Sequence, residues 1–330
     1  MAKYRAPRTA KLNIHLWADW VELLCISNSD GVTTEAIVRK RCIEERDGDV
    51  EAADALAEEL EAEAVAEDDL DVVEDDKLDA EVRGWFGHLK MRAELFGDAY
   101  PFIVADDALA VRAEHTATQL LYVALLMMSN LGNFPKKKVQ PNLTAGFEWL
   151  SLHVFRQLLP ANAQTHLFRG SQRYPSEFTG KLWPRLQKLA HVLGEQVKLA
   201  EAEVSATNTG DKGLDLIGWL PLPDKAPGRL ILFGQCACTE DWTSKQHSIS
   251  AGRWRNRISL KSNPMSVVFI PFCQRGPEQS WHQHDDMDDT CIFMDRFRLL
   301  HLLSATADQF LNLPALQEAT SCLADKEEAA

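Results

Sequence analysis

The sequence predicts an α/β or α+β protein in which a mainly helical N-terminal module precedes a domain of mixed helices and strands. The 330 residues are enough for about two domains. A hydrophobic content of 45% with 25% charged residues is typical of an ordinary globular chain. Helical periodicity dominates residues 1–140, and short β-rich runs alternate with helices after that point.

Residues 1–140 are expected to form the helical recognition or regulatory module. Apolar spacing predicts four helices, at Leu16–Cys25, Thr33–Cys42, Arg83–Phe96 and His115–Leu131. The last of these is apolar around most of its circumference, as in a buried helix. A basic segment with one proline, residues 133–138, closes the module.

One strongly acidic stretch interrupts this module. Residues 44–81 contain 19 acidic side chains against two basic ones, a local net charge of −17, so the rest of the chain carries +3 of the total of −14. Charge repulsion and low apolar content favour a solvated insert. The alternative is a mimic of phosphate charge that shields a basic groove.

The second domain is expected at residues 141–310, followed by a C-terminal tail at 311–330. Thr144 is expected to cap a helix that ends before Pro160, and Ser176 to cap a helix over Glu177–Val197. The remaining pattern predicts strands at Leu214–Leu220, Arg229–Gln235, Ser266–Phe272 and Cys291–Met294, then a helix at Arg296–Ala305.

Several classes of protein are excluded at this level. The longest apolar run, Leu120–Met128, is too short to span a bilayer, and no secretory signal is apparent, so a cytoplasmic location is expected. The seven cysteines form no CxxC pair and are expected to be reduced thiols. Cys236 with His247 makes a poor nucleophilic pair because no third orienting residue can be named.

The residues with most chemical information lie on a predicted hairpin. Antiparallel pairing about the middle of the proline-containing loop at residues 221–228 places Asp215 opposite Gln235. Mg²⁺ prefers oxygen ligands, and Asp215, the amide oxygen of Gln235 and the carbonyl of Cys236 are candidates. Lys245 is expected to share a helix face with Trp242 and to orient or polarise an attacking water.

These residues resemble the PD-(D/E)xK, or restriction-endonuclease-like, nuclease superfamily, especially its Mrr-like members. The resemblance covers about residues 144–250, on Gly213-Leu214-Asp215 and Gln235-Cys236-Ala237. It implies a central mixed sheet flanked by helices. Ala237 stands where the family carries lysine, and Lys245 is the candidate for a displaced lysine. The family glutamate from the helix before the hairpin matches Glu148 best and Glu177 second.

The resemblance implies a Mg²⁺- or Mn²⁺-dependent endonuclease that hydrolyses DNA phosphodiester bonds, with a role in bacterial restriction or anti-phage defence. Asp215, Glu148 and Gln235 would hold metal while Lys245 assists the water. A regulatory or ATPase partner protein and self-association are further expectations. Because Ala237 replaces the lysine, the competing hypothesis is a non-catalytic nuclease-fold subunit that binds nucleic acid or a partner.

A basic and aromatic cluster follows the candidate site. Phosphate contacts and base stacking would suit its residues, which are Arg253, Trp254, Arg255, Arg257 and Lys261. Such clusters are also common on ordinary surfaces. Asp211 is expected to be a turn residue, and the His- and Asp-rich segment 282–289 is expected to be a solvated loop, although it could bind a metal of its own.

Overall fold

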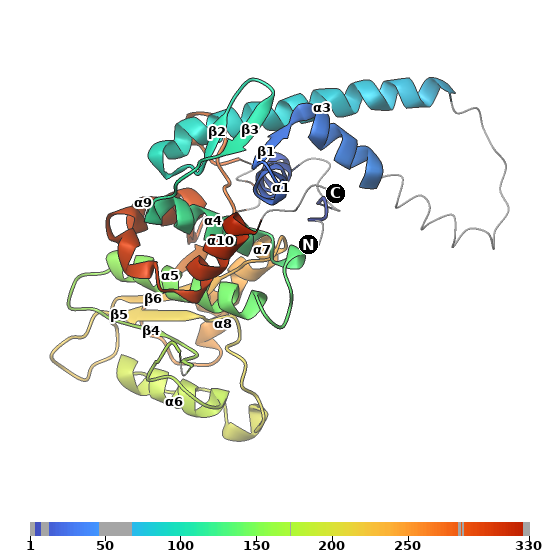
Figure 1. Cartoon of the computed structure of the whole chain (residues 1–330). Helices are drawn as coiled ribbons and strands as arrows, with labels where there is room; N and C mark the ends of the chain where they lie inside the picture. The colour runs from blue at the N-terminus through green and yellow to red at the C-terminus, as the bar shows by residue number, and fades with distance from the viewer. Residues whose placement is uncertain are drawn as a thin grey trace.

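The structure is a computed structural model that describes residues 4–7, 13–45, 68–171, 173–282, 285 and 287–325. The described residues form helices around a five-stranded mixed sheet and a three-stranded antiparallel sheet, which confirms the mixed α/β class (Figure 1). Most of the acidic stretch, at 46–67, lies outside the described residues, and so does the expectation of a solvated insert there.

The larger sheet has the strand order β4-β5-β6-β7-β8. Its strands are β4 (Gln164–Leu167), β5 (Leu216–Trp219), β6 (Ile231–Cys236), β7 (Met265–Phe269) and β8 (Cys291–Met294). The first three strands pair antiparallel, while β7 and β8 run parallel to β6. Four of these strands match the predicted runs. The edge strand β4 was not predicted because the sequence Gln-Thr-His-Leu carries no apolar alternation.

The predicted register of the hairpin is confirmed. Leu216 pairs with Gly234 and Trp219 with Ile231. The amide of Asp215 donates to the carbonyl oxygen of Gly234 over 2.9 Å, which continues the ladder past the end of β5. Asp215 and Gln235 are therefore neighbours at the open end of the hairpin.

Helices cover both faces of this sheet (Figure 1). The helix α5 (Gln140–Gln157) packs on the face that carries Leu216 and Leu232. The helices α6 (Leu182–Leu193) and α8 (Ala251–Arg255) pack on the face that carries Ile217 and Phe233. Strand alternation separates these two side-chain sets as predicted.

Two helix starts differ from the predictions. The helix α5 begins at Gln140 with a proline in its first turn, and Thr144 lies inside it, where its hydroxyl donates to the Gln140 carbonyl over 3.0 Å. The helix α6 begins at Leu182 instead of Glu177. Ser176 instead accepts from the amide of Phe178, so it caps a local turn. Serine and threonine make both kinds of local bond, which is why their position alone misled.

The N-terminal part contains α1 (Ile14–Ser27), a helix over residues 35–45, α3 (Asp68–Phe96) and α4 (Ala117–Ser129). Thr116 and Gln119 form a capping box at the start of α4. A small sheet that was not predicted joins them, with the order β1 (Val32–Thr34), β3 (Ala108–Val111) and β2 (Phe102–Val104). Thr33, expected in a helix, lies in β1.

The C-terminal residues are not a simple tail. After α9 (Arg296–Leu303), the helix α10 (Pro314–Ala324) packs against α4 and α5. The contact is close, because a Cβ added at Gly146 of α5 would lie 2.6 Å from the Cβ of Ala315. The expectation of a tail at 311–330 is therefore wrong for residues 314–324. Apolar residues of α1, α4, α5, α10 and β5 to β7 share one hydrophobic core across the expected boundary at residue 140.

A buried ion network ties α1, α3 and α9 together. Asp19 of α1 accepts from Arg92 of α3 over 2.7 Å and from Arg296 of α9 over 2.7 Å. Arg92 also donates to Glu22 over 2.9 Å, and Tyr122 donates to the same carboxylate. Burial alone would raise the pKa of Asp19, but Arg296 and Arg92 outweigh it and the pKa is lowered. The carboxylate is therefore ionised and paired.

No helix among the described residues is both long enough and apolar enough to cross a membrane.

We expect Arg92→Met to lower the free energy of unfolding by about 3–5 kcal/mol, because it leaves buried carboxylates without a counter-charge. The matched control is Lys90→Met on the same helix, which removes an ion pair to the fully exposed Asp106 and should leave the free energy of unfolding nearly unchanged, because water screens such a pair. Chemical denaturation of the two variants measures the difference. Equal losses would contradict a structural role for the network.

Candidate active site

Asp215 lies just before β5, with one carboxylate oxygen held by two donors. Its Oδ2 accepts from the backbone amide of Cys236 over 2.7 Å and from Nε2 of Gln235 over 2.6 Å. Within the described residues, its Oδ1 accepts no hydrogen bond that would compete for a ligand. The backbone of β6 thus fixes the orientation of the carboxylate and leaves one oxygen available.

The side chain of Gln235 is oriented differently from the expectation. Its amide nitrogen faces Asp215, and its Oε1 accepts from the hydroxyl of Ser248 over 2.7 Å. The carbonyl of Cys236 accepts from the same Gln235 amide over 3.0 Å. In this arrangement both oxygens accept protein donors. Gln235 is a positioning residue for Asp215, and ligation of metal by Gln235 and Cys236 stays a prediction.

Gly213 allows this arrangement because of its backbone conformation and its lack of a side chain. Its φ of +81° lies in the left-handed region. A Cβ added there would lie 2.5 Å from the Cβ of Ser248 and 2.8 Å from Oε1 of Gln235. The preceding Asp211 accepts from the Gly213 amide over 2.8 Å and closes the turn. The glycine of the Gly-Leu-Asp pattern is therefore required by the close approach of Ser248.

Three carboxylates from two elements lie within electrostatic reach of one another. Burial, and then the nearby Asp211, raise the pKa of Glu148 on α5 to about 7. Burial, and then Glu148 and Asp211, raise the pKa of Asp215 well above its usual range. Glu148 thus acts electrostatically on Asp215, and so does Asp211, which was expected only to form the turn.

Lys245 lies on the short helix α7 (Trp242–Lys245), directly after the hairpin. Trp242 is buried, and its ring packs edge to face on Phe293 with centroids 5.8 Å apart. Lys245 is only half-buried, and its positive charge acts to lower the pKa of Asp215, although burial outweighs it. The helix therefore anchors on Trp242 and places Lys245 on the side of the carboxylates.

Ala237 has no exposed surface and belongs to the core that contains Ile217 and Phe233. A lysine at this position would have its ammonium group buried among apolar side chains, which is costly unless the side chain reaches the surface. The packing gives a physical reason for a small apolar residue there, and it leaves Lys245 as the lysine close to Asp215.

Arg169 is a further cation that the sequence did not single out. It follows β4 by two residues, and its charge acts to lower the pKa of Glu148. Because β4 itself was not predicted, no pattern connected Arg169 to the hairpin. Two cations therefore act on the carboxylate cluster: Arg169, which precedes the hairpin in the chain, and Lys245, which follows it.

Other candidate residues lie elsewhere. Glu177 is exposed and pairs with Lys188 over 3.0 Å, so it does not join Glu148. Trp254 is fully buried, and its indole donates to the carbonyl of Ser248 over 3.1 Å. The expectation that Trp254 stacks on a base is therefore wrong. Burial raises the pKa of the Cys236 thiol, which disfavours a thiolate nucleophile.

The carboxylates of the cluster are oxygen donors of the kind that a Mg²⁺ ion requires. Among the described residues, including those of the segment 282–289, no three His, Cys, Asp or Glu side chains form a group that could hold a metal ion by themselves. Mg²⁺ is commonly held by one or two carboxylates, with waters and substrate phosphates completing its shell. Asp215 and Glu148 fit that smaller set, because the charge of Glu148 opposes ionisation of Asp215 and a cation would relieve that cost.

Comparisons with protein-family models, with curated proteins and with solved structures give no match to this chain.

We expect Gly213→Ala to destabilise the fold more than Gly228→Ala. Both glycines have a positive φ, of +81° and +92°, so both variants carry a backbone cost of about 1–2 kcal/mol. Only Gly213→Ala also collides with neighbours, since a Cβ at Gly228 meets nothing within 4 Å. The extra loss should be about 1–3 kcal/mol by denaturant unfolding, and equal losses would contradict the close approach of Ser248.

We expect Glu148→Gln to stabilise the metal-free protein at pH 8 by about 1–3 kcal/mol. The folded pKa of about 7 is above the ordinary 4.5, so the contribution of this carboxyl is fully present below pH 4.5 and is lost as pH rises through 7. The gain should therefore shrink toward pH 5. Glu177→Gln is the exposed control and should show no such gain, and parallel pH profiles for wild type and Glu148→Gln would refute the clustering.

Proposed function

We propose that this chain is a Mg²⁺-dependent endonuclease that hydrolyses phosphodiester bonds of DNA. The observation that carries the proposal is the convergence of Glu148 from α5, Asp215 at the start of β5 and Lys245 from α7 at one end of the hairpin. Two clustered carboxylates beside a cation have the composition of a site for metal-assisted phosphate chemistry.

The arrangement of the elements supports a restriction-endonuclease-like fold as part of this proposal. A mixed sheet is covered by helices on both faces. The helix with Glu148 precedes the hairpin, and the helix with Lys245 follows it directly. This is the order in which the resemblance requires its functional residues.

In the proposed mechanism, the residues of the chain mainly bind and orient. Asp215 through Oδ1 and Glu148 would hold the metal ion, which when bound supplies positive charge to the phosphate and acidity to a water. The Cys236 amide and Gln235 keep Asp215 fixed through its other oxygen. Lys245 orients the attacking water or its proton, and Arg169 offsets the negative charge around Glu148.

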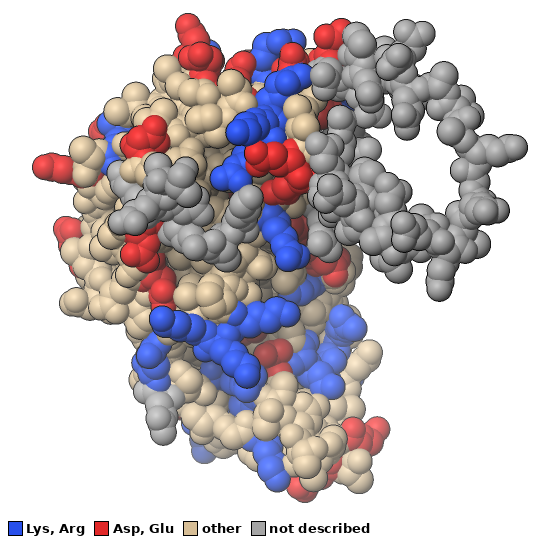
Figure 2. All heavy atoms as spheres, turned by 45° about the vertical axis from the view of Figure 1, so that its right-hand side comes forward, with Lys and Arg blue, Asp and Glu red and all other residues tan. Residues whose placement is uncertain are grey.

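One face of the molecule carries basic side chains suited to a polyanion. Figure 2 shows Lys and Arg side chains gathered on the lower half of one face, on either side of an acidic spot. Arg253, Arg255 and Lys261 are exposed in the segment that follows the candidate site. Such cations contact phosphates without reading sequence. Restriction or anti-phage defence, together with a regulatory or ATPase partner protein, extends the proposal along the resemblance.

A second candidate function is supported by Ala237. If Lys245 does not replace the family lysine, the same fold and basic surface would serve a non-catalytic subunit that binds nucleic acid or a partner. The two candidates differ in whether metal produces cleavage.

We expect metal-dependent nicking of supercoiled plasmid DNA by the full-length chain, with Mg²⁺ or Mn²⁺ and none in EDTA. Asp215→Asn, Glu148→Gln and Lys245→Met should each reduce the cleavage rate about 100-fold or more, because each removes a ligand or a water-orienting group. Agarose gels of a time course measure the loss of supercoiled substrate.

Glu177→Gln is the matched control, since it removes an exposed carboxylate that lies outside the cluster, and it should cleave at the wild-type rate. Circular dichroism melting verifies that each variant folds. Retained cleavage in Asp215→Asn would refute the assigned site. Metal-independent DNA binding without cleavage by the wild type would favour the non-catalytic subunit.

A further inference from the structure

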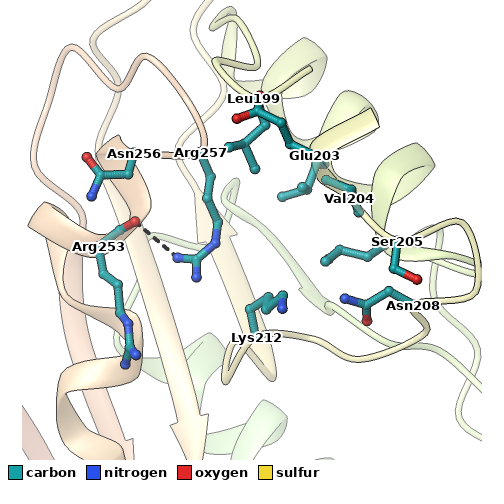
Figure 3. Close-up of a pocket in the computed structure, with 11 residues that line it drawn as sticks. Leu199, Glu203, Val204, Ser205, Asn208, Lys212, Arg253, Asn256 and Arg257 are labelled. Atoms are coloured by element: carbon teal, nitrogen blue, oxygen red, sulfur yellow. Dashed lines mark hydrogen bonds between the residues drawn. The ribbon is translucent and has the colours of Figure 1, made fainter. Parts of the chain in front are cut away.

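A cavity of about 460 Å³ lies between α6, the loop at 199–208 and α8 (Figure 3). Its size falls within the range of about 300–1,000 Å³ that is usual for small-molecule sites. Lys212 lines it and is the residue between Asp211 and Gly213. The cavity is therefore next to the carboxylate cluster along the chain, yet none of the three carboxylates lines it.

Three cations line one side of this cavity, namely Lys212, Arg253 and Arg257. Figure 3 shows the guanidinium of Arg257 between Arg253 and Lys212. Within the described residues, none of the three forms an ion pair with a carboxylate. The acid in the lining, Glu203, accepts from the backbone amide of Ala200 over 2.6 Å. The cavity therefore carries an excess of positive charge suited to a phosphate group.

The opposite side of the cavity is apolar. Leu199, which is half-buried, and Val204 form this surface (Figure 3), and the buried Leu182 and Leu186 complete the apolar lining. Asn208 and Asn256 add amide groups at its margins. A planar ring with polar edges suits such a wall, since its faces pack on leucine and its edges meet amides. Inorganic phosphate would use the cations alone and leave this apolar surface exposed to water.

The walls are held in place before any ligand binds. Arg185 of α6 donates to the carbonyls of Thr209 and Gly210 over 2.8 and 2.7 Å. The amide of Leu182 donates to the carbonyl of Asn208 over 2.8 Å. Lys212 has a φ of +61°, a left-handed conformation that is unfavourable for a non-glycine residue and is fixed here by the turn at Asp211. Preorganised walls reduce the entropy lost on binding.

We propose that this cavity binds a single nucleotide unit, with its phosphate on Lys212, Arg253 and Arg257 and its base against Leu199 and Val204. The inference rests on the proposed function for the source of that unit, which is a DNA strand whose terminal or unstacked nucleotide enters beside the carboxylates. A free nucleotide has the same chemistry. A duplex is too wide for this volume, so an extruded or single-stranded nucleotide is required.

The test is calorimetric titration of the full-length chain in EDTA with adenosine 5′-monophosphate, ribose 5-phosphate and inorganic phosphate. We expect the nucleotide to bind at least 10-fold more tightly than ribose 5-phosphate, because only the nucleotide carries a base. Equal affinities for the three probes would overturn the proposal and leave an anion site only. Absence of nucleotide binding would also overturn it.

Arg253→Gln and Lys212→Gln should each weaken nucleotide binding about 10-fold, because each removes a charged hydrogen-bond donor. Both side chains are exposed, so the fold should tolerate the change. Lys198→Gln is the matched control, since Lys198 is an exposed cation next to Leu199 in the chain but outside the lining of the cavity. An equal effect of Lys198→Gln would indicate a general basic surface and overturn the assignment.

Competition identifies the source of the nucleotide. A single-stranded 8-mer that displaces adenosine monophosphate places a strand nucleotide in the cavity, whereas nucleotide binding without displacement assigns the cavity to a free nucleotide. Since these measurements are made in EDTA, they do not depend on cleavage. If the nuclease proposal is wrong, metal-dependent nicking will be absent while nucleotide binding is still measured. If the nucleotide proposal is wrong, the titration will show no preference for the nucleotide, whatever the nicking assay shows.

Discussion

The buried pair between Asp19 and Arg296 is the interaction on which the assembly of this fold depends. Arg296 begins α9 immediately after β8, and Asp19 lies in the middle of α1. A pair with no exposure carries a large desolvation cost, so both charges must be matched closely to be stable. The match fixes the N-terminal helix against the end of the large sheet. It thereby gives the helical part and the sheet one shared core.

The electrostatics of the hairpin end are opposite to those of this network. In the network, arginines lower the pKa of Asp19 in spite of its burial. At the hairpin, burial and neighbouring carboxylates raise the pKa values of Asp215 and Glu148. The structural carboxylate is thus held ionised by arginine, whereas at the hairpin burial and the neighbouring carboxyl groups oppose ionisation. Carboxyl groups whose ionisation is opposed in this way are a feature of functional sites.

The sequence was sufficient for the local features of the site and insufficient for its surroundings. Strand alternation and loop symmetry correctly placed Asp215 beside Gln235, because pairing in a hairpin is a local property. The direction of the Gln235 amide depends on Ser248, which is brought in by tertiary packing. Trp254 looked like a binding residue because basic residues flank it, but side-chain burial depends on the sheet beneath it. Arg169 was missed with its strand.

The turn at Asp211 to Gly213 connects the two proposed binding regions. Asp211 adds charge to the carboxylate cluster, Lys212 lines the cavity, and Gly213 gives Ser248 room to hold Gln235. Asp211 also closes the turn through the Gly213 amide, so the three residues belong to one hydrogen-bonded turn. Lys212 takes an unfavourable left-handed backbone conformation in this turn. The turn thereby gives the negative charge of Asp211 to the carboxylate cluster and the positive charge of Lys212 to the cavity.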